Sequence, residues 1–182
     1  VGIMDTFTDY PSVERILGKG DTKSSVLLRG GLQTDLRVVP AESRGAALQY
    51  FTGSKSHNIV LRDRALQRGL KLNEYGLYRT SDDHLVAGAN EEDIYECLGL
   101  SWVPPELREN RGEIEAAHAR LLPKLIELAD LRGDLHMHTR ETDGRDTIES
   151  MVLAARAAGM QYVAVTDHSQ SLAMANGLDE RR

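Results

Sequence analysis

The stretch Gly133–His168, GDLHMHTRETDGRDTIESMVLAARAAGMQYVAVTDH, combines three patterns that decide the fold of the C-terminal part. The run DLHMHT is typical of a strand, TIESMVLAARAAG of an amphipathic helix that ends at Gly159, and YVAVTDH of a buried strand. This order predicts a βαβ unit with parallel strands and a right-handed crossover. Both strands then end at one edge of the sheet, where α/β barrels and open α/β sheets carry their functional sites.

Histidines and one acid gather at these two strand ends. His136 and His138 are two residues apart on a strand, so both rings leave the same face, with backbones about 6.5–7 Å apart. That separation lets both imidazoles reach one cation at about 2.1 Å. Asp143 follows in a TDG turn, and His168 ends the second strand. A lone HxH pair is usually an uncoordinated surface pair, but the TDH motif on the next strand favours a metal site.

These motifs resemble the PHP (polymerase and histidinol phosphatase) family, whose members carry an HxH strand, an SDG-like turn and a TDHS strand end. The resemblance covers residues 133–182 and implies a distorted seven-stranded α/β barrel with up to three metal ions that hydrolyses phosphoesters with a metal-bound hydroxide. It implies that the three histidines and the aspartate above are ligands, for Zn²⁺ or Mn²⁺. Other family ligands come from later strands, so only the first βαβ of the barrel is expected here. Asp134 and Asp167 fit hydrogen-bonding roles or strand-end caps better than direct ligation.

Strand patterns dominate near the N-terminus. The run SSVLLRGGLQTDLRVV predicts a β-hairpin joined at Gly30 and Gly31, and the strand period of two places Asp35 on its more polar face. Before this hairpin, YPSVERIL predicts a short helix with Pro11 at its start.

The middle of the chain alternates helices with a small sheet. ESRGAALQYF predicts one helix, and SHNIVLRDRALQRG a second one capped at Ser56 or Asn58, with Leu61, Ala65 and Leu66 as its core stripe. LKLNE, GLYRT and HLVAG predict three short strands.

Two further helices are expected before the βαβ unit. NEEDIYECLGL predicts a helix between an Asn90 N-cap and Gly99, and RGEIEAAHARLLPKLIELADLRG predicts a helical connector interrupted or kinked at Pro123. Cys97 lies alone in an apolar stretch and is expected to be a buried structural thiol rather than a nucleophile.

Charge is distributed unevenly along the chain. The net charge of −6 argues against a generally basic coat for nucleic acid. Residues 44–79 nevertheless hold seven cations against two acids, whereas residues 80–115 hold ten acids against two cations. The first segment is therefore the one suited to meet an anion. Without an apolar span or a signal sequence, the expectation is a cytoplasmic protein that does not enter a membrane.

A second resemblance covers the cationic segment. ALQYFTGSKSHNIVLRDRALQRGLKLNEYGLY (residues 47–78) is similar to the junction of palm and thumb in family X DNA polymerases, especially the bacterial members fused to a PHP domain. PPELRENRGEIEAA resembles the end of that thumb. The resemblance implies an α+β palm and thumb fragment before the PHP segment. The implied parts are residues 1–49 (C-terminal palm), 50–110 (thumb), 111–132 (helical linker) and 133–182 (truncated PHP domain).

The polymerase resemblance also implies roles for individual residues. A nucleotidyl transferase holds two Mg²⁺ ions with carboxylates, and Asp35 matches the third, catalytic carboxylate, near the primer terminus. The first two, in a GDID-like strand, do not occur in these 182 residues. Other matched positions lie against the sugar, base and minor-groove edge of an incoming dNTP and against the template strand. These residues are Tyr50, Phe51, Thr52, Gly53, Lys55, Asn58 and Arg62.

The expected function is therefore that of a central piece of a gap-filling DNA polymerase with a PHP 3′–5′ exonuclease or related phosphoesterase. The 182 residues alone are expected to do neither reaction, since two palm carboxylates and later barrel ligands are missing, and the truncated part is open to self-association. A free-standing PHP phosphatase of small molecules and a non-catalytic DNA-binding module remain as alternatives. An upstream GDID-like strand and further His, Glu or Asp strand ends downstream would distinguish them.

Overall fold

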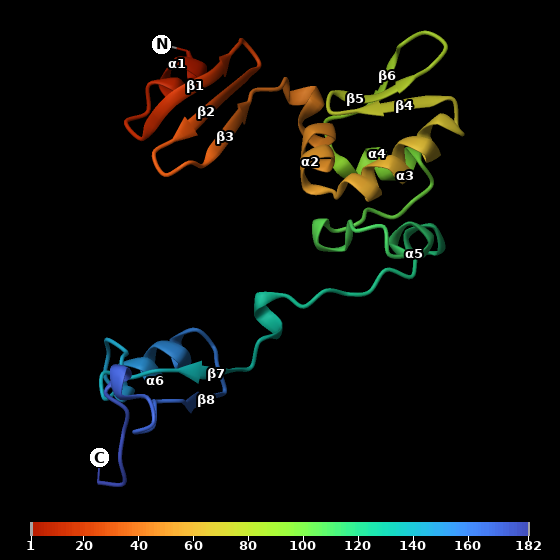
Figure 1. Cartoon of the computed structure of the whole chain (residues 1–182). Helices are drawn as coiled ribbons and strands as arrows, with labels where there is room; N and C mark the ends of the chain where they lie inside the picture. The colour runs from red at the N-terminus through yellow and green to blue at the C-terminus, as the bar shows by residue number, and fades with distance from the viewer. Residues whose placement is uncertain (1, 182) are drawn as a thin grey trace. The chain divides into compact units, whose positions relative to one another are not determined.

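The computed structural model describes residues 2–181 and contains two compact units, residues 1–123 and 124–182 (Figure 1). The first unit holds two antiparallel three-stranded sheets, and the second holds a parallel pair of strands. In the part of the chain that is described, no helix has both the length and the apolar character needed to cross a membrane.

The N-terminal sheet has the order β1-β2-β3 and follows a short helix. Its elements are α1 (Ile3–Thr8), β1 (Val13–Lys19), β2 (Lys23–Leu28) and β3 (Gln33–Arg37). The predicted hairpin is confirmed, since β2 and β3 pair antiparallel and the turn places Gly30 and Gly31 at φ 98° and 86°. Only glycine adopts such angles at little steric cost. Val26, in the middle of the sheet, is fully buried.

The helix predicted for YPSVERIL is wrong, because Val13–Lys19 forms β1. Ile16 pairs with Val26 of β2, and the helix lies earlier in the chain, over Ile3–Thr8. Pro11 falls in the turn in which the Val13 amide donates to the Tyr10 carbonyl at 2.9 Å. Pairing with a neighbouring strand outweighs the helix-start signal of one proline, and the β-branched Val13 and Ile16 suit that pairing.

Helices and a second sheet of order β4-β5-β6 form the rest of the first unit. The predicted strands and the first helices are confirmed. The helices are α2 (Arg44–Thr52), α3 (Lys55–Leu66), α4 (Glu91–Cys97) and α5 (Glu113–Ala119), and the strands are β4 (Leu70–Asn73), β5 (Gly76–Arg79) and β6 (Leu85–Ala87). Short 3-10 turns lie at Ala41–Ser43, Pro105–Leu107, Leu128–Asp130 and Ala173–Ala175.

The core of this unit lies between α3, α4 and the second sheet. Leu61 and Ala65 of α3 pack there with 0% exposure, as the helical period predicts. Leu66 was predicted to join them but is 58% exposed, because it ends the helix. The N-cap of α3 is Ser54, whose hydroxyl accepts from the His57 amide, so the caps predicted at Ser56 or Asn58 are wrong.

The expectation of a buried Cys97 is also wrong. Cys97 is the last residue of α4, and its side chain is exposed. The core face of that helix is formed by Ile94 and Tyr95, both 0% exposed, and Cys97 lies past it at the C-terminal end.

A buried arginine connects the end of this unit to the turn after α2. Arg108 is 0% exposed; its Nε donates to the Val103 carbonyl at 2.9 Å, and its Nη1 donates to Glu91 at 2.8 Å and to the Thr52 hydroxyl. The Arg108 carbonyl in turn accepts from the Ser54 amide at 3.0 Å. Among the described residues, Nη2 has no hydrogen-bond partner. The segment around Arg108 thus holds both ends of the Thr52–Ser54 turn.

A second buried network joins α3 to α5. The Nδ1 of His57 lies 2.6 Å from Glu113, and its Nε2 lies 3.0 Å from the Tyr95 hydroxyl. Burial lowers the pKa of His57, against the opposing effect of Glu113. Burial alone would raise the pKa of Glu113, but hydrogen bonds from His57 and from backbone amides lower it overall. A neutral His57 between a carboxylate and a phenol is therefore the stable arrangement.

Acidification is expected to destabilise the first unit through His57. Because the pKa of His57 is lowered by folding, the unfolded chain binds more protons below its ordinary pKa of about 6.5. As the pH falls below that value, protonation of His57 in the unfolded chain should lower the free energy of unfolding by up to about 1.4 kcal/mol per pH unit. Above that value His57 should have no effect on it. Urea unfolding at several pH values measures the slope. His57→Gln should flatten it, exposed His84→Gln should not, and an unchanged slope in His57→Gln would contradict the assignment.

The long helical connector expected over residues 111–133 is wrong beyond Ala119. Arg120 adopts the left-handed conformation with φ 58°, which ends α5 before Pro123 is reached. Leu121, Ile126 and Leu128 are each at least 75% exposed. Leu122 packs against the core of the first unit while these three side chains are exposed, so the stretch has no single buried face that would support a continuous helix.

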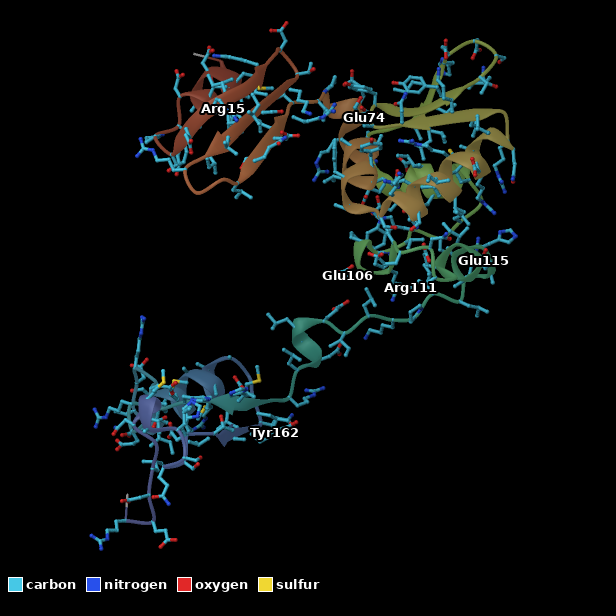
Figure 2. All side chains as sticks on the ribbon, in the orientation of Figure 1. Arg15, Glu74, Glu106, Arg111, Glu115 and Tyr162 are labelled. Atoms are coloured by element: carbon cyan, nitrogen blue, oxygen red, sulfur yellow. The ribbon has the colours of Figure 1, made fainter. Side chains whose placement is uncertain are left out.

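The second unit is the predicted βαβ. Its elements are β7 (Gly133–Met137), α6 (Ile148–Ala157) and β8 (Tyr162–Val165), with β7 and β8 parallel. Gly133 lets the ring of Tyr162, labelled in Figure 2, lie directly against the strand, since a Cβ there would be 2.3 Å from that ring and the ring would have to move. The strands are shorter than predicted and stop before His138 and Thr166. The residues of the HxH and TDH motifs therefore lie at and just beyond the strand ends.

Candidate metal centre and nucleic-acid interface

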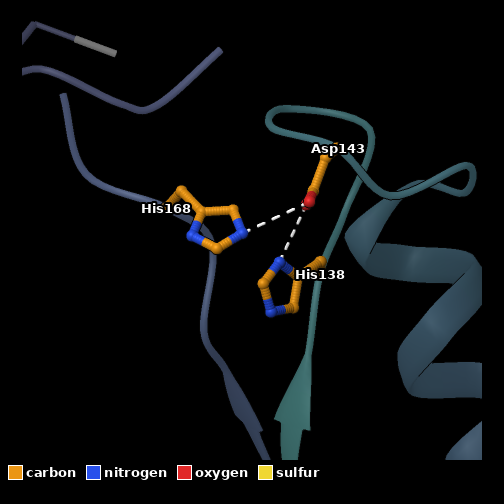
Figure 3. A group of neighbouring side chains, drawn as sticks. All are labelled: His138, Asp143 and His168. Atoms are coloured by element: carbon orange, nitrogen blue, oxygen red, sulfur yellow. Dashed lines mark hydrogen bonds and ion pairs between the residues drawn. The ribbon is translucent and has the colours of Figure 1, made fainter. Parts of the chain in front are cut away.

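Three side chains converge where β7 and β8 end (Figure 3). Asp143 lies between two imidazoles, with Oδ1 at 2.8 Å from His138 Nδ1 and Oδ2 at 3.2 Å from His168 Nε2. One donor atom from each of the three residues lies within 4.8 Å of the others. Neutral imidazole and carboxylate suit Zn²⁺ and Mn²⁺, so this donor set fits a divalent cation.

His136 lies beside this group rather than within it. Its Nε2 is 3.0 Å from the Nε2 of His138, and the two ring centroids are 5.1 Å apart. The His136 amide donates to Asp134 at 2.9 Å, which places that carboxylate beside the strand. His138 therefore has Asp143 on one ring nitrogen and His136 on the other, and the four predicted ligands form one continuous cluster.

The backbone of the loop after β7 explains why Asp143 reaches this position. The amides of Thr142 and Gly144 both donate to the Thr139 carbonyl, at 3.1 and 2.9 Å. A side chain on Gly144 would lie 2.2 Å from the His138 carbonyl oxygen, so the loop closes only with glycine there. A hydrogen bond from His138 lowers the pKa of Asp143, and the charge of His168 acts in the same direction, which keeps the carboxylate ionised.

A pocket of about 390 Å³ lies where α2 meets α3. Five of the residues predicted to contact nucleotide or DNA line it, together with Ile59. They are Tyr50, Gly53, Lys55, Asn58 and Arg62. Arg62 also lies over the ring of Tyr50, with 5.2 Å between its guanidinium carbon and the ring centroid.

Asn58 and Gly53 have a structural role that their motif did not reveal. The Asn58 amide donates to the Tyr50 carbonyl at 2.8 Å and accepts from Gln49 at 2.7 Å, so it holds the end of α2. A side chain on Gly53 would lie 2.8 Å from the Asn58 oxygen. The glycine therefore permits the close approach of Asn58, where the sequence suggested close approach of a ligand.

Phe51 and Asp35 lie outside the lining of this pocket. Phe51 is 53% exposed and faces Arg37, whose guanidinium carbon is 5.4 Å from the ring centroid. Asp35 is exposed on β3, where it pairs with Lys23 at 3.2 Å and accepts from Gln33. Hydrogen bonds from Ser25, Gln33 and Lys23 lower its pKa, so it is ionised at neutral pH.

Comparisons with known proteins match the two segments that carry these candidate sites to two families. Residues 47–109 match the family described as DNA polymerase beta thumb, and residues 134–180 match the PHP domain. The DNA polymerase/3′-5′ exonuclease PolX of Bacillus subtilis is 38% identical over 182 residues, which cover 99% of this chain and 32% of that protein. The chain is therefore similar to a PolX-type family X DNA polymerase over nearly all of its own length. It spans about a third of the length of that relative.

More distant polymerases match a smaller share of this chain. Human DNA-directed DNA/RNA polymerase mu is 38% identical over 78 residues, which cover 42% of this chain and 16% of that protein. The structure of Leishmania infantum polymerase beta in a ternary P/T complex superposes with a TM-score of 0.50 and 23% identity, over 58% of this chain and 50% of that one. The latter likeness shows a polymerase beta-like palm and thumb fold, with mixed α and β content.

The sequence did not reveal several ion pairs that involve cations of the first unit. Arg37 lies 3.6 Å from Glu74, which follows β4 and is labelled in Figure 2. Lys71 and Arg79, counted among the cations available to an anion, are paired with Asp83 and Asp82 at 2.7 and 2.8 Å. Arg79 and Asp82 are only three residues apart, whereas the other two pairs join residues that are far apart in the sequence and depend on how the chain folds back.

Proposed function

We propose that this chain serves the DNA-binding and catalytic parts of a gap-filling DNA polymerase that also carries a PHP phosphoesterase or 3′–5′ exonuclease. The observation that carries this proposal is the pocket between α2 and α3, lined by residues with the chemistry to hold a nucleotide and DNA. The order of thumb and PHP segments along the chain, which the B. subtilis PolX shares, supports the combination of both activities.

In the polymerase reaction, the pocket would bind and orient a dNTP on the primer-template. Tyr50 and Gly53 would lie against the sugar, Lys55 and Asn58 at the base and minor-groove edge, and Arg62 against the template strand. The lining of the pocket by these five residues supports that assignment. Arg62 suits this role because minor-groove acceptors are nearly independent of sequence. Phe51 would complete the turn, and Asp35 would be the carboxylate that binds Mg²⁺ beside the primer hydroxyl.

In the PHP part, His136, His138, Asp143 and His168 would hold Zn²⁺ or Mn²⁺ at the edge of the first βαβ of a seven-stranded barrel. Such ions supply a Lewis acid and a nucleophile at neutral pH when bound. The residues described here orient the site, since Asp143 is held between His138 and His168 and the His136 backbone is held by Asp134. Residues 1–49, 50–110, 111–132 and 133–182 would then be palm, thumb, linker and PHP segment, the linker being mostly non-helical.

DNA binding by the thumb gives a direct test. Affinity for gapped DNA should fall steeply with salt, because cations that contact phosphates release counterions. Arg62→Ala should weaken binding by about 1–3 kcal/mol. Arg79→Ala removes an equal charge that Asp82 already neutralises and should bind like the unchanged protein. Fluorescence anisotropy over a salt series measures both. Salt-independent binding, or equal losses in the two variants, would remove the thumb assignment.

Metal binding tests the PHP proposal separately. The 182-residue chain should bind Zn²⁺ weakly in isothermal titration, and His138→Ala should abolish the signal because His138 contacts both His136 and Asp143. His84→Ala removes a histidine of the first unit and should leave the titration unchanged. Equal binding by the two variants would exclude the β7 histidines as ligands. Hydrolysis of a small phosphoester without DNA binding would instead favour a free-standing phosphatase.

A further inference from the structure

A carboxylate that is not among the expected ligands ties together the two loops of the metal cluster. Asp167 Oδ1 accepts from the Thr139 amide at 2.7 Å and from the Thr142 hydroxyl, and its Oδ2 accepts from the Thr139 hydroxyl at 2.7 Å. Thr139 is 1% exposed and Thr142 is 9% exposed. The contacts span 28 and 25 residues along the chain, so they join the loop after β7 to the end of β8.

The position of these three residues in the chain gives the contacts their significance. Thr139 directly follows His138, Thr142 directly precedes Asp143, and Asp167 directly precedes His168. Each of the three donor residues is therefore adjacent in the sequence to one residue of the Asp167 hydrogen-bond network. Fixing that network fixes the spacing of the three donor groups.

The same contacts argue against Asp167 as a ligand. Both of its oxygens accept hydrogen bonds from donors with low exposure, and direct coordination would require at least one of these bonds to break. A carboxylate accepts at both oxygens, so Asp167 takes all three hydrogen bonds at once. Hydrogen bonds to an ionised acceptor are stronger and more directional than neutral ones.

We propose that Asp167 is a positioning residue that sets the distances among His138, Asp143 and His168 and thereby the affinity and coordination geometry of the bound cation. This inference rests on the proposed metal centre. Residues that orient ligands from outside the coordination sphere typically change metal affinity by about 10- to 100-fold when replaced. Asp167 differs from them in holding the loop after β7, through one backbone amide and two hydroxyls, rather than one ligand ring.

The test uses the intact 182-residue chain and Asp167→Asn, which keeps the size of the side chain but turns one acceptor into a donor. Its Kd for Zn²⁺ by isothermal titration should rise about 10- to 100-fold. The visible spectrum of bound Co²⁺ should also change, because that spectrum reports coordination geometry. Thr142→Val removes one hydroxyl at nearly constant volume and should shift both readouts in the same direction by less.

A control separates positioning from general loss of stability. Thr147→Ala removes the N-cap hydroxyl of α6, which accepts from the Ser150 amide at 3.1 Å in the same unit. It should lower thermal stability without changing the Co²⁺ spectrum. If Asp167→Asn and Thr142→Val change neither affinity nor spectrum while His138→Ala still abolishes binding, the role of Asp167 is overturned and the metal centre stands. If the chain without substitutions binds no metal, the proposed metal centre and the positioning role of Asp167 are both overturned. Should Asp167→Asn fail to fold, Thr142→Val decides alone.

Discussion

Replacing Arg108 by methionine is expected to lower the free energy of unfolding of the first unit by about 3–5 kcal/mol. The substitution leaves Glu91, which is only 13% exposed, without its cationic partner, and it removes the donors to Val103 and Thr52. Breaking one side of a buried ion pair costs more than the pair contributes, because the remaining charge stays desolvated. The effect is therefore far larger than that of a surface pair.

Urea unfolding monitored by tryptophan fluorescence measures this loss. Trp102 is the single tryptophan, it donates to Glu91 at 3.1 Å, and its ring lies 5.9 Å from the Arg108 guanidinium carbon, so it reports on this unit. Arg79→Met is the matched control. Its pair with Asp82 is about half exposed on both sides, and its loss should cost about 0–1 kcal/mol. Similar losses in the two variants would show that burial of Arg108 contributes little.

Asp35→Ala is expected to reduce primer extension by about 10²-fold or more in a PolX-type chain that also carries the other palm carboxylates. The lowered pKa of Asp35 keeps it ionised at neutral pH, as a Mg²⁺ ligand and an acceptor near the primer hydroxyl must be. Its position on β3 is exposed, so the fold should tolerate the change.

Primer extension and DNA affinity, measured on the same samples, separate catalysis from binding. Extension should fall while the Kd for gapped DNA changes little, since Asp35 carries no positive charge toward phosphate. Glu14→Ala removes an exposed acid from β1 of the same sheet and should leave extension intact. Extension that survives in Asp35→Ala would make Asp35 an ordinary surface residue that pairs with Lys23.

Local sequence patterns correctly predicted the helices and strands that pair or pack with segments nearby in the sequence. The Gly30-Gly31 hairpin and the βαβ unit formed as expected, because turn chemistry and apolar periodicity agree there with the tertiary structure. The helix predictions for the β1 segment and for the connector were wrong for different reasons. In β1, pairing with Val26 of β2 outweighed a helix-start signal. In the connector, the apolar residues at helical spacing do not form one buried face, since Leu122 packs against the core while Leu121 is exposed, and α5 ends at Ala119.

The same distinction holds for the sites. Alternation on one strand and a motif at the end of the next were enough to predict that His138 and His168 would meet. The support of Asp143 by Asp167 was not predictable, because it depends on how the Thr139–Gly144 loop folds back. The burial of Arg108 was hidden for a similar reason, since a charged residue in a polar run ordinarily lies in solvent.

The exposed Cys97 gives the thumb a single site for covalent labelling with a thiol reagent. It is the one cysteine in the sequence, so a maleimide probe would attach at a defined point on α4, the helix that also carries Glu91. Partial burial and the nearby Asp93 and Glu96 raise the pKa of its thiol, and the thiolate is the species that reacts. Labelling should therefore be slower than that of a free cysteine at neutral pH and accelerate in mild base, which allows a dye to be placed at the C-terminal end of α4 without introducing a substitution.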